Sequence, residues 1–131
     1  MEKLILTDAA WKKKLSEEAY HVLREKGTER AFAGQYHHCD EKGIYVCAAC
    51  DNPLFSSAHQ FDSGTGWPSF WAPLSLQAIV LEEDFSLVLK RIEVTCARCN
   101  AHLGHVFPDG PPPTHQRYCM NSIALKLTAK K

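Results

Sequence analysis

Cys47-Ala48-Ala49-Cys50 and Cys96-Ala97-Arg98-Cys99 are two C-x-x-C pairs that stand far apart in the 131-residue chain. Within a pair, two intervening residues let both sulfurs turn toward one ion, and two pairs complete a tetrahedral site with no open position. Each pair follows a stretch with strand character, so we expect the sulfurs to meet where neighbouring strands end. The pairs predict one structural zinc ion, coupled to folding and held by Cys47, Cys50, Cys96 and Cys99. Two disulfides or a thioredoxin-like redox pair are the alternatives, and no βαβ pattern supports the redox pair.

From about residue 30 the apolar residues alternate with period two, which predicts β-strands. The predicted strands are 43–47, 76–82, 85–90, 91–95 and 122–128, and Ile123, Leu125 and Leu127 share one face of the last. Turn-rich connections at 51–75 and 108–113 separate them. The pattern indicates a mostly antiparallel β domain with long loops.

The segment 7–27 has the pattern of two short helices. Thr7 or Asp8 can cap the first helix, Ser16 can cap the second, and Gly27 predicts the stop. We expect this helical segment (1–28) to pack on the β domain, so that residues 1–131 form a single domain.

Charge and hydropathy exclude several classes of partner. Lysine plus arginine and aspartate plus glutamate number 15 each, so no charge excess favours nucleic acid or an anionic membrane. No apolar run reaches membrane-spanning length, and the first residues lack the apolar core of a secretory signal. With the paired cysteines, this favours a reducing compartment, and we expect a cytoplasmic monomer.

The stretch Arg117-Tyr118-Cys119-Met120-Asn121-Ser122 places a cysteine outside the paired scheme. If the stretch is extended, Arg117, Cys119 and Asn121 share one face. A guanidinium and an amide beside a thiol lower its pKa and make it nucleophilic. A buried strand cysteine is the plainer alternative. Upstream, His102 and His105 are three apart, so in a strand they face opposite ways, and one could line a pocket while the other packs or binds backbone. The plainer alternative for either is a hydrogen-bonded core histidine or a neighbour of the zinc ligands.

Six motifs together resemble the methionine sulfoxide reductase B family, over about residues 15–127. They are Gly27-Thr28-Glu29-Arg30, the two cysteine pairs, Gly66-Trp67-Pro68-Ser69-Phe70, Gly104-His105-Val106-Phe107-Pro108-Asp109-Gly110-Pro111, and the stretch around Cys119. The resemblance implies two antiparallel sheets and reduction of the R epimer of methionine sulfoxide in proteins. It also implies structural zinc, which many members have, and regeneration by thioredoxin or a small thiol.

The resemblance also implies roles for individual residues. Cys119 matches the nucleophile that becomes a sulfenic acid, and His105, more than His102, matches the group that protonates the sulfoxide oxygen. The remaining matches are Asn121 and Asp109 for orientation, Arg117 beside the thiolate, and Trp67 and Phe107 against the substrate.

One position departs from the family pattern. Many members carry a resolving cysteine between the two glycines before the tryptophan, where this chain has Thr65. Cys39 could resolve the sulfenic acid instead if it can approach Cys119. Direct attack by thioredoxin or a small thiol is the alternative, and an incidental loop thiol is the plainer reading of Cys39.

Other functional classes remain as alternatives. A zinc-bound β module could bind a protein partner without chemistry, but would have no use for Cys119 with an amide and two histidines. A nucleic-acid-binding zinc ribbon predicts a basic patch, whereas 96–121 holds only Arg98 and Arg117 as cations. The motifs around Cys119 do not suggest a cysteine hydrolase.

Overall fold

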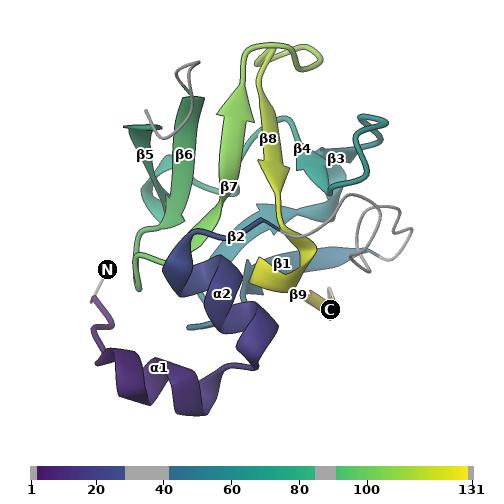
Figure 1. Ribbon diagram of the computed structural model, residues 1–131. Coiled ribbons are helices and arrows are strands. Elements are labelled where there is room, and N and C mark those ends of the chain that lie inside the picture. The colour runs from purple at the N-terminus through teal and green to yellow at the C-terminus, as the bar shows by residue number, and fades with distance from the viewer. Residues whose placement is uncertain (1–2, 29–41, 85–90, 130–131) are drawn as a thin grey trace.

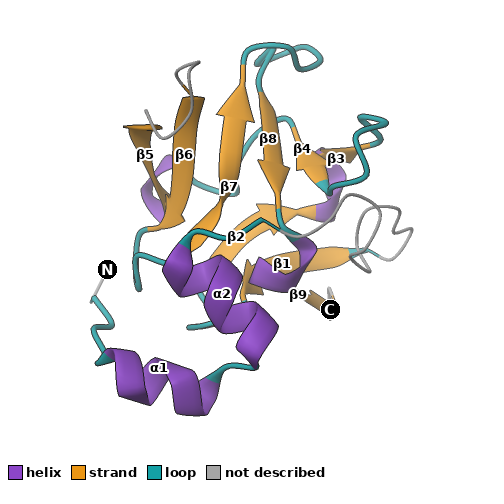
Figure 2. Ribbon diagram, in the orientation of Figure 1, coloured by secondary structure: helices purple, strands orange, loops and turns teal. Residues whose placement is uncertain are grey.

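The computed structural model describes residues 3–28, 42–84 and 91–129. Its helices are α1 (Asp8–Lys14) and α2 (Glu17–Glu25). Its strands are β1 (Gly43–Cys47), β2 (Pro53–Ser56), β3 (Gln60–Phe61), β4 (Ser69–Phe70), β5 (Ile79–Asp84), β6 (Arg91–Cys96), β7 (His102–Phe107), β8 (Arg117–Met120) and β9 (Leu125–Ala129). The architecture is mainly β, with both α-helices at one end (Figure 2). Within the described chain, neither helix is long and apolar enough to cross a membrane.

The strands form two sheets in which every pairing is antiparallel, as predicted (Figure 1). The smaller sheet has the order β2-β1-β9, and the larger has the order β3-β4-β8-β7-β6-β5. β8 and β9 are close in sequence but belong to different sheets, so the chain crosses between the sheets just after Cys119. The two central strands of the larger sheet are β7, which carries His102 and His105, and β8, which carries Cys119.

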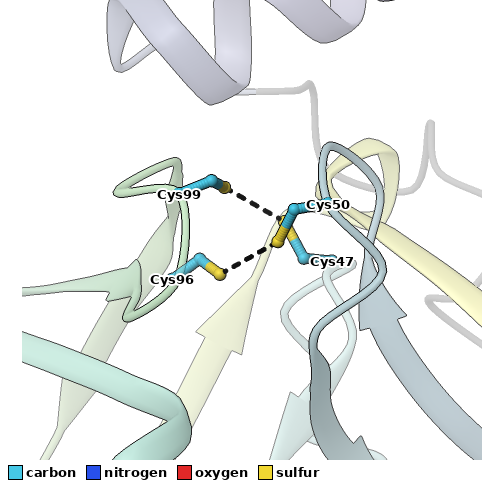
Figure 3. Close-up of side chains that lie close together, drawn as sticks. All are labelled: Cys47, Cys50, Cys96 and Cys99. Atoms are coloured by element: carbon cyan, nitrogen blue, oxygen red, sulfur yellow. Dashed lines mark hydrogen bonds between the residues drawn. The ribbon is translucent and has the colours of Figure 1, made fainter. Parts of the chain in front are cut away.

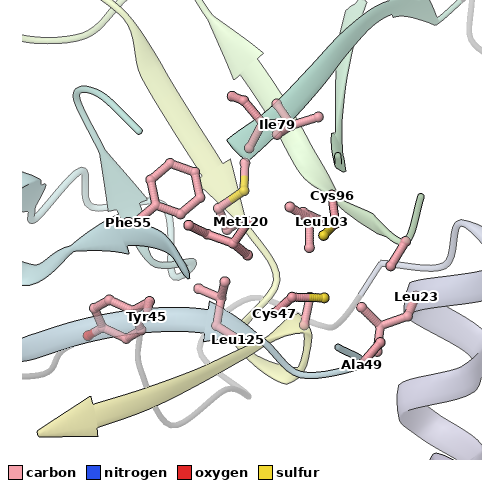
Figure 4. Packing of buried hydrophobic residues seen from close by; sticks show 14 of the residues in the cluster. Leu23, Tyr45, Cys47, Ala49, Phe55, Ile79, Cys96, Leu103, Met120 and Leu125 are labelled. Atoms are coloured by element: carbon pink, nitrogen blue, oxygen red, sulfur yellow. The ribbon is translucent and has the colours of Figure 1, made fainter. Parts of the chain in front are cut away.

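The core lies where the two sheets face each other (Figure 4). Phe55 from the smaller sheet stacks on Phe70 from the larger, with ring centroids 4.5 Å apart. In β8, Tyr118 and Met120 are buried in this core, whereas Arg117 and Cys119 alternate with them and are half-buried. The strand period therefore assigns Cys119 to the face of the larger sheet that does not form the core.

The two predicted helices are confirmed, with their caps. The Thr7 hydroxyl accepts from the Ala10 amide at 3.2 Å, and the Ser16 hydroxyl accepts from the Ala19 amide at 3.1 Å. α2 packs on β7. The predicted stop is displaced, because the left-handed residue that ends α2 is Lys26 (φ 60°) and not Gly27.

Two predicted strands begin later than expected. Residues Leu76–Ala78 and Ser122–Ala124 are 3₁₀ turns, and they lead into β5 and β9. The second turn makes the crossover between the sheets, which a continuous strand over 122–128 could not do. The strands predicted at 43–47 and 91–95 are confirmed as β1 and β6, and 85–90 lies outside the described residues.

Gly104 allows β7 and β8 to approach closely beside Cys119. A β-carbon at this position would collide with the backbone carbonyl of Cys119 and the α-carbon of Met120. Backbone atoms cannot turn aside as a flexible side chain can, so we expect Gly104→Ala to lower the free energy of unfolding by about 3 kcal/mol, measured by denaturant titration.

Gly64→Ala is the matched control for this substitution. A β-carbon at Gly64 meets nothing within 4 Å, and only the positive φ of 75° is strained. We expect Gly64→Ala to lower the free energy of unfolding by about 1 kcal/mol. Equal losses in the two variants would show that the crowding at Gly104 costs nothing.

Candidate active site and metal centre

The four paired cysteines form one buried cluster, in which all sulfurs lie within 4.8 Å of one another. Sulfurs of different pairs are in contact: Cys47 Sγ lies 3.7 Å from Cys99 Sγ, and Cys50 Sγ lies 3.5 Å from Cys96 Sγ (Figure 3). A tetrahedral ion with Zn–S bonds of about 2.3 Å requires sulfurs about 3.8 Å apart, so the cluster fits such an ion.

The sequence suggested that the two cysteine pairs end neighbouring strands, and this expectation is wrong. The first pair follows β1 of the smaller sheet, and the second follows β6 of the larger sheet. The two strands are not paired, so the sulfurs meet where one sheet approaches the other. An ion held there would join the two sheets.

Each C-x-x-C pair forms a tight turn, called a knuckle below, and the two knuckles have the same backbone geometry. In the first, the Asp51 amide donates to the Cys47 carbonyl at 2.8 Å, and in the second the Asn100 amide donates to the Cys96 carbonyl at 2.8 Å. Asp51 and Asn100 are both left-handed, with φ of 65° and 66°. Asparagine and aspartate tolerate this conformation better than most residues, which explains their place directly after each pair.

The knuckles are also surrounded by donors. The Asn52 side-chain amide points at Cys96 Sγ, 3.5 Å away. Three cations donate to knuckle carbonyls: Lys3 to Ala97 at 2.6 Å, Arg24 to Cys99 at 2.8 Å, and Arg98 to Cys50. This positive surrounding suits a metal–thiolate cluster, which carries net negative charge.

Within the cluster, hydrogen bonds between the thiols lower the pKa of some cysteines and raise that of others. Hydrogen bonding with Cys47 lowers the pKa of Cys50 to about 7 and also lowers that of Cys96. Hydrogen bonding with Cys50 raises the pKa of Cys47. Four buried sulfurs cannot all ionise without a cation between them, so the donor set fits a thiophilic tetrahedral ion.

A row of polar residues runs straight across the larger sheet on its other face. In the strand register Ser69 lies opposite Cys119, Cys119 opposite His105, and His105 opposite Glu93. Residues directly opposite in antiparallel strands have side chains on the same face, about 5 Å apart at the β-carbon. Ser69, His105 and Glu93 are buried, and Cys119 is half-buried. The predicted nucleophile thus has one predicted histidine as its immediate neighbour.

His102 joins the row through a β-bulge. The register pairs Val94 with Gly104 and Thr95 with His102, so one extra residue, Leu103, stands between. The prediction that His102 and His105 face opposite ways is therefore wrong: their rings pack edge to face, with centroids 5.3 Å apart. A bulge adds one residue and so reverses the alternation.

Asn121 helps to hold the bulge. Its backbone amide and its side-chain amide both donate to the Leu103 carbonyl, at 2.9 and 3.1 Å. Asn121 follows directly after β8, so it links the strand of Cys119 to the strand of the histidines. Arg117 and Cys119 share the predicted face, and Asn121 is buried just beyond the strand end.

Burial raises the pKa of Cys119, and the positive charge of Arg117 and a hydrogen bond from the Thr65 hydroxyl lower it to a smaller extent. The expectation of a lowered thiol pKa is therefore wrong, because desolvation of the thiolate outweighs the stabilising groups. At neutral pH the resting group is the thiol. The contact with Thr65 also shows that this position lies beside the sulfur.

Arg117 is held by two partners on its own face. Its guanidinium makes a double hydrogen bond to the Asp109 carboxylate, at 2.9 and 3.2 Å, which lowers the pKa of Asp109. The same guanidinium lies over the ring of Phe107, 4.5 Å from its centroid. These contacts fix the cation near Cys119.

The loop that carries Trp67 is tied to the row by hydroxyl groups. Ser63 Oγ lies 2.8 Å from both Thr65 Oγ1 and Ser69 Oγ, and Ser69 donates to the Trp67 carbonyl at 3.2 Å. Trp67 is partly exposed on this loop, which ends at Ser69, opposite the predicted nucleophile.

Glu93 and Ser69 were not predicted from the sequence as site residues. Glu93 alternates with apolar Ile92 and Val94 in its strand, a pattern typical of a residue that faces solvent, yet it is only 3% exposed. Ser69 was seen only as part of a motif. Cys39 lies outside the described residues.

Comparison with known proteins identifies the family. A family model described as SelR domain matches residues 15–129. A protein of Methanosarcina mazei named peptide methionine sulfoxide reductase MsrB is 55% identical over 98% of this chain and 92% of its own length. Proteins of the same name from Pseudomonas syringae pv. syringae and Thioalkalivibrio sulfidiphilus are 55% and 56% identical, over 99% and 95% of this chain and 99% and 90% of their own lengths. The chain therefore belongs to the SelR-domain, or methionine sulfoxide reductase B, family.

Proposed function

We propose that the chain is a single-domain, thiol-dependent peptide-methionine (R)-S-oxide reductase. The observation that carries the proposal is the pairing of Cys119 with His105 across adjacent strands, in a chain more than half identical to proteins named peptide methionine sulfoxide reductase MsrB. A reductase of this kind needs a thiol and a proton carrier side by side, and the row supplies both.

In the proposed reaction the sulfur of Cys119 attacks the sulfur of methionine sulfoxide, and the S–O bond to methionine breaks. The oxygen and the thiol proton both end on Cys119 as a sulfenic acid, so the thiol is oxidised by two electrons and the sulfoxide is reduced to the thioether. His105 takes the thiol proton and returns it to the departing oxygen. A thiol with a raised pKa supports this role, because its proton stays available until substrate arrives.

The neighbouring residues support this step. Arg117, fixed by Asp109, stabilises the thiolate as it forms, and Asn121 holds the bulge that brings His102 against His105. Trp67 and Phe107 supply apolar surface for the methyl group of the substrate. These roles are supported by the position of each residue in the sheet or in the loops beside it, and by family membership.

Regeneration completes the proposed cycle. A thiol attacks the sulfenic acid, water leaves, and a second thiol reduces the mixed disulfide. Thr65 stands beside Cys119 where a resolving cysteine would act, and its hydroxyl cannot replace one. We infer that thioredoxin or a small thiol attacks directly, in a reducing compartment such as the cytoplasm, on a monomeric protein. The resolving role of Cys39 stays a prediction.

We further propose that the four-cysteine cluster holds one zinc ion. The ion would supply structural cross-linking of the sheets and no chemistry at Cys119, because four thiolates leave no open coordination position.

The function is tested with the separated R and S epimers of N-acetylmethionine sulfoxide and dithiothreitol. We expect reduction of the R epimer only, and a fall in kcat/KM of at least about 10³-fold in Cys119→Ser, which loses the nucleophile. The Cys119→Ser protein should keep its unfolding midpoint, which excludes a folding defect. If the folded wild-type protein reduces neither epimer, a module that only binds a partner becomes the better explanation.

The raised pKa predicts how alkylation of Cys119 depends on pH. Burial disfavours the charged thiolate, so the iodoacetamide rate in a Cys39→Ser background should increase with pH and reach half-maximum above pH 9, the ordinary thiol value of 9.0. Arg117→Leu removes the cation that opposes this shift and should move the midpoint higher still. A midpoint near pH 7 would contradict the assigned burial effect.

Metal content provides a separate test of the cluster. We expect about one zinc ion per chain by elemental analysis, and loss of the ion with partial or full unfolding in Cys96→Ser. Cys119→Ser is the matched control, since it removes a thiol outside the cluster and should retain zinc. A wild-type protein that stays folded without metal would exclude structural zinc.

A further inference from the structure

Glu93 is a buried carboxylate with a partner on each oxygen. Its Oε2 lies 2.7 Å from His102 Nδ1, and its Oε1 lies 3.2 Å from the ammonium group of Lys26. Glu93 and His102 are each 3% exposed. A buried acidic side chain is costly unless it is paired in this way. Lys26 is the left-handed residue that ends α2, and its side chain extends from there to the Glu93 carboxylate.

The contact with Glu93 determines the form of the His102 ring. A carboxylate only accepts hydrogen bonds, so Nδ1 must carry the proton that it donates. Burial lowers the pKa of His102, which keeps the ring neutral and leaves Nε2 with a lone pair. His102 Nε2 is buried and has no hydrogen-bond partner among the described residues. An unpaired buried acceptor costs free energy that an ordinary core histidine avoids.

The His102 ring lies at the centre of the site. It packs edge to face against His105, and His105 lies opposite Cys119 in the register. The Glu93 carboxylate, two imidazole rings and the thiol thus follow one another across β6, β7 and β8. Rotation of the His102 ring about χ2 would change its packing on His105 and would move Nε2, with its lone pair, to another position.

We propose that Glu93 is a positioning residue, which holds His102 as the Nδ1-protonated tautomer and keeps its ring fixed against His105. The inference rests on the proposed reductase function, which it deepens by assigning a task to a residue outside the family motifs noted above. Glu93 contacts His102 and Lys26, and in the register His105 stands between Glu93 and Cys119. It acts through the two histidines, as the carboxylate of a Ser-His-Asp triad acts through its histidine.

The experiment combines imidazole ¹⁵N NMR with steady-state kinetics on Glu93→Gln. The two nitrogens of a neutral imidazole differ strongly in ¹⁵N shift, and the His102 signals are assigned by their loss in His102→Gln. In the wild type we expect a protonated Nδ1 and an unprotonated Nε2. In Glu93→Gln the amide can donate to Nδ1 as well as accept from it, so the single tautomer should be lost.

Kinetically, Glu93→Gln should lower kcat for the R epimer by about 10- to 100-fold and change KM by less than about 3-fold. The reason is that the variant disturbs proton transfer and leaves the apolar contacts to the substrate intact. Glu82→Gln is the matched control. Glu82 lies opposite Glu93 on β5 and is exposed, so this variant should keep wild-type kinetics and the wild-type tautomer.

A wild-type His102 protonated at Nε2 would overturn the proposal, and this result does not depend on the folding of Glu93→Gln. A Glu93→Gln protein with unchanged kcat would overturn it as well. Failure of the proposed function gives a different result, since the wild type would then reduce neither epimer while the tautomer measurement would still decide whether Glu93 holds His102.

Discussion

The register between β7 and β8 is the constraint on which the site depends. It sets His105 opposite Cys119, and it brings the strands so close that only glycine fits at position 104. A shift of one residue would turn Cys119 into the core and Tyr118 and Met120 out of it. The buried face of β8 therefore stabilises the same register that the chemistry requires, so that packing and function do not compete.

The metal centre and the proposed active site share two strands. Glu93 lies three residues before Cys96 on β6, and His102 lies three residues after Cys99 at the start of β7. The second knuckle is the connection between these strands, so an ion that fixes it also fixes the ends from which the Glu93–His102 contact extends. A structural ion can in this way support catalytic geometry without taking part in a step.

Local sequence patterns predicted those features that local interactions determine. The caps at Thr7 and Ser16 and the strands at 43–47 and 91–95 are each specified by a few neighbouring residues. The four-cysteine cluster joins distant parts of the chain, but each C-x-x-C pair that forms it is a local motif. Family resemblance added the two sheets. The bulge at Leu103 could not be predicted, because it exists only in relation to the partner strand. The raised pKa of Cys119 was missed for a similar reason: Arg117 is visible in the sequence, and the depth of burial is not.

Asn121 connects two elements through a single acceptor. Its two donors converge on the Leu103 carbonyl, at the point where β8 ends and the chain turns toward the smaller sheet. Substitutions at Asn121, Leu103 and His102 therefore act on one shared geometry, and their energetic effects should not add. A change at one of these three positions is therefore expected to alter which residues the other two tolerate.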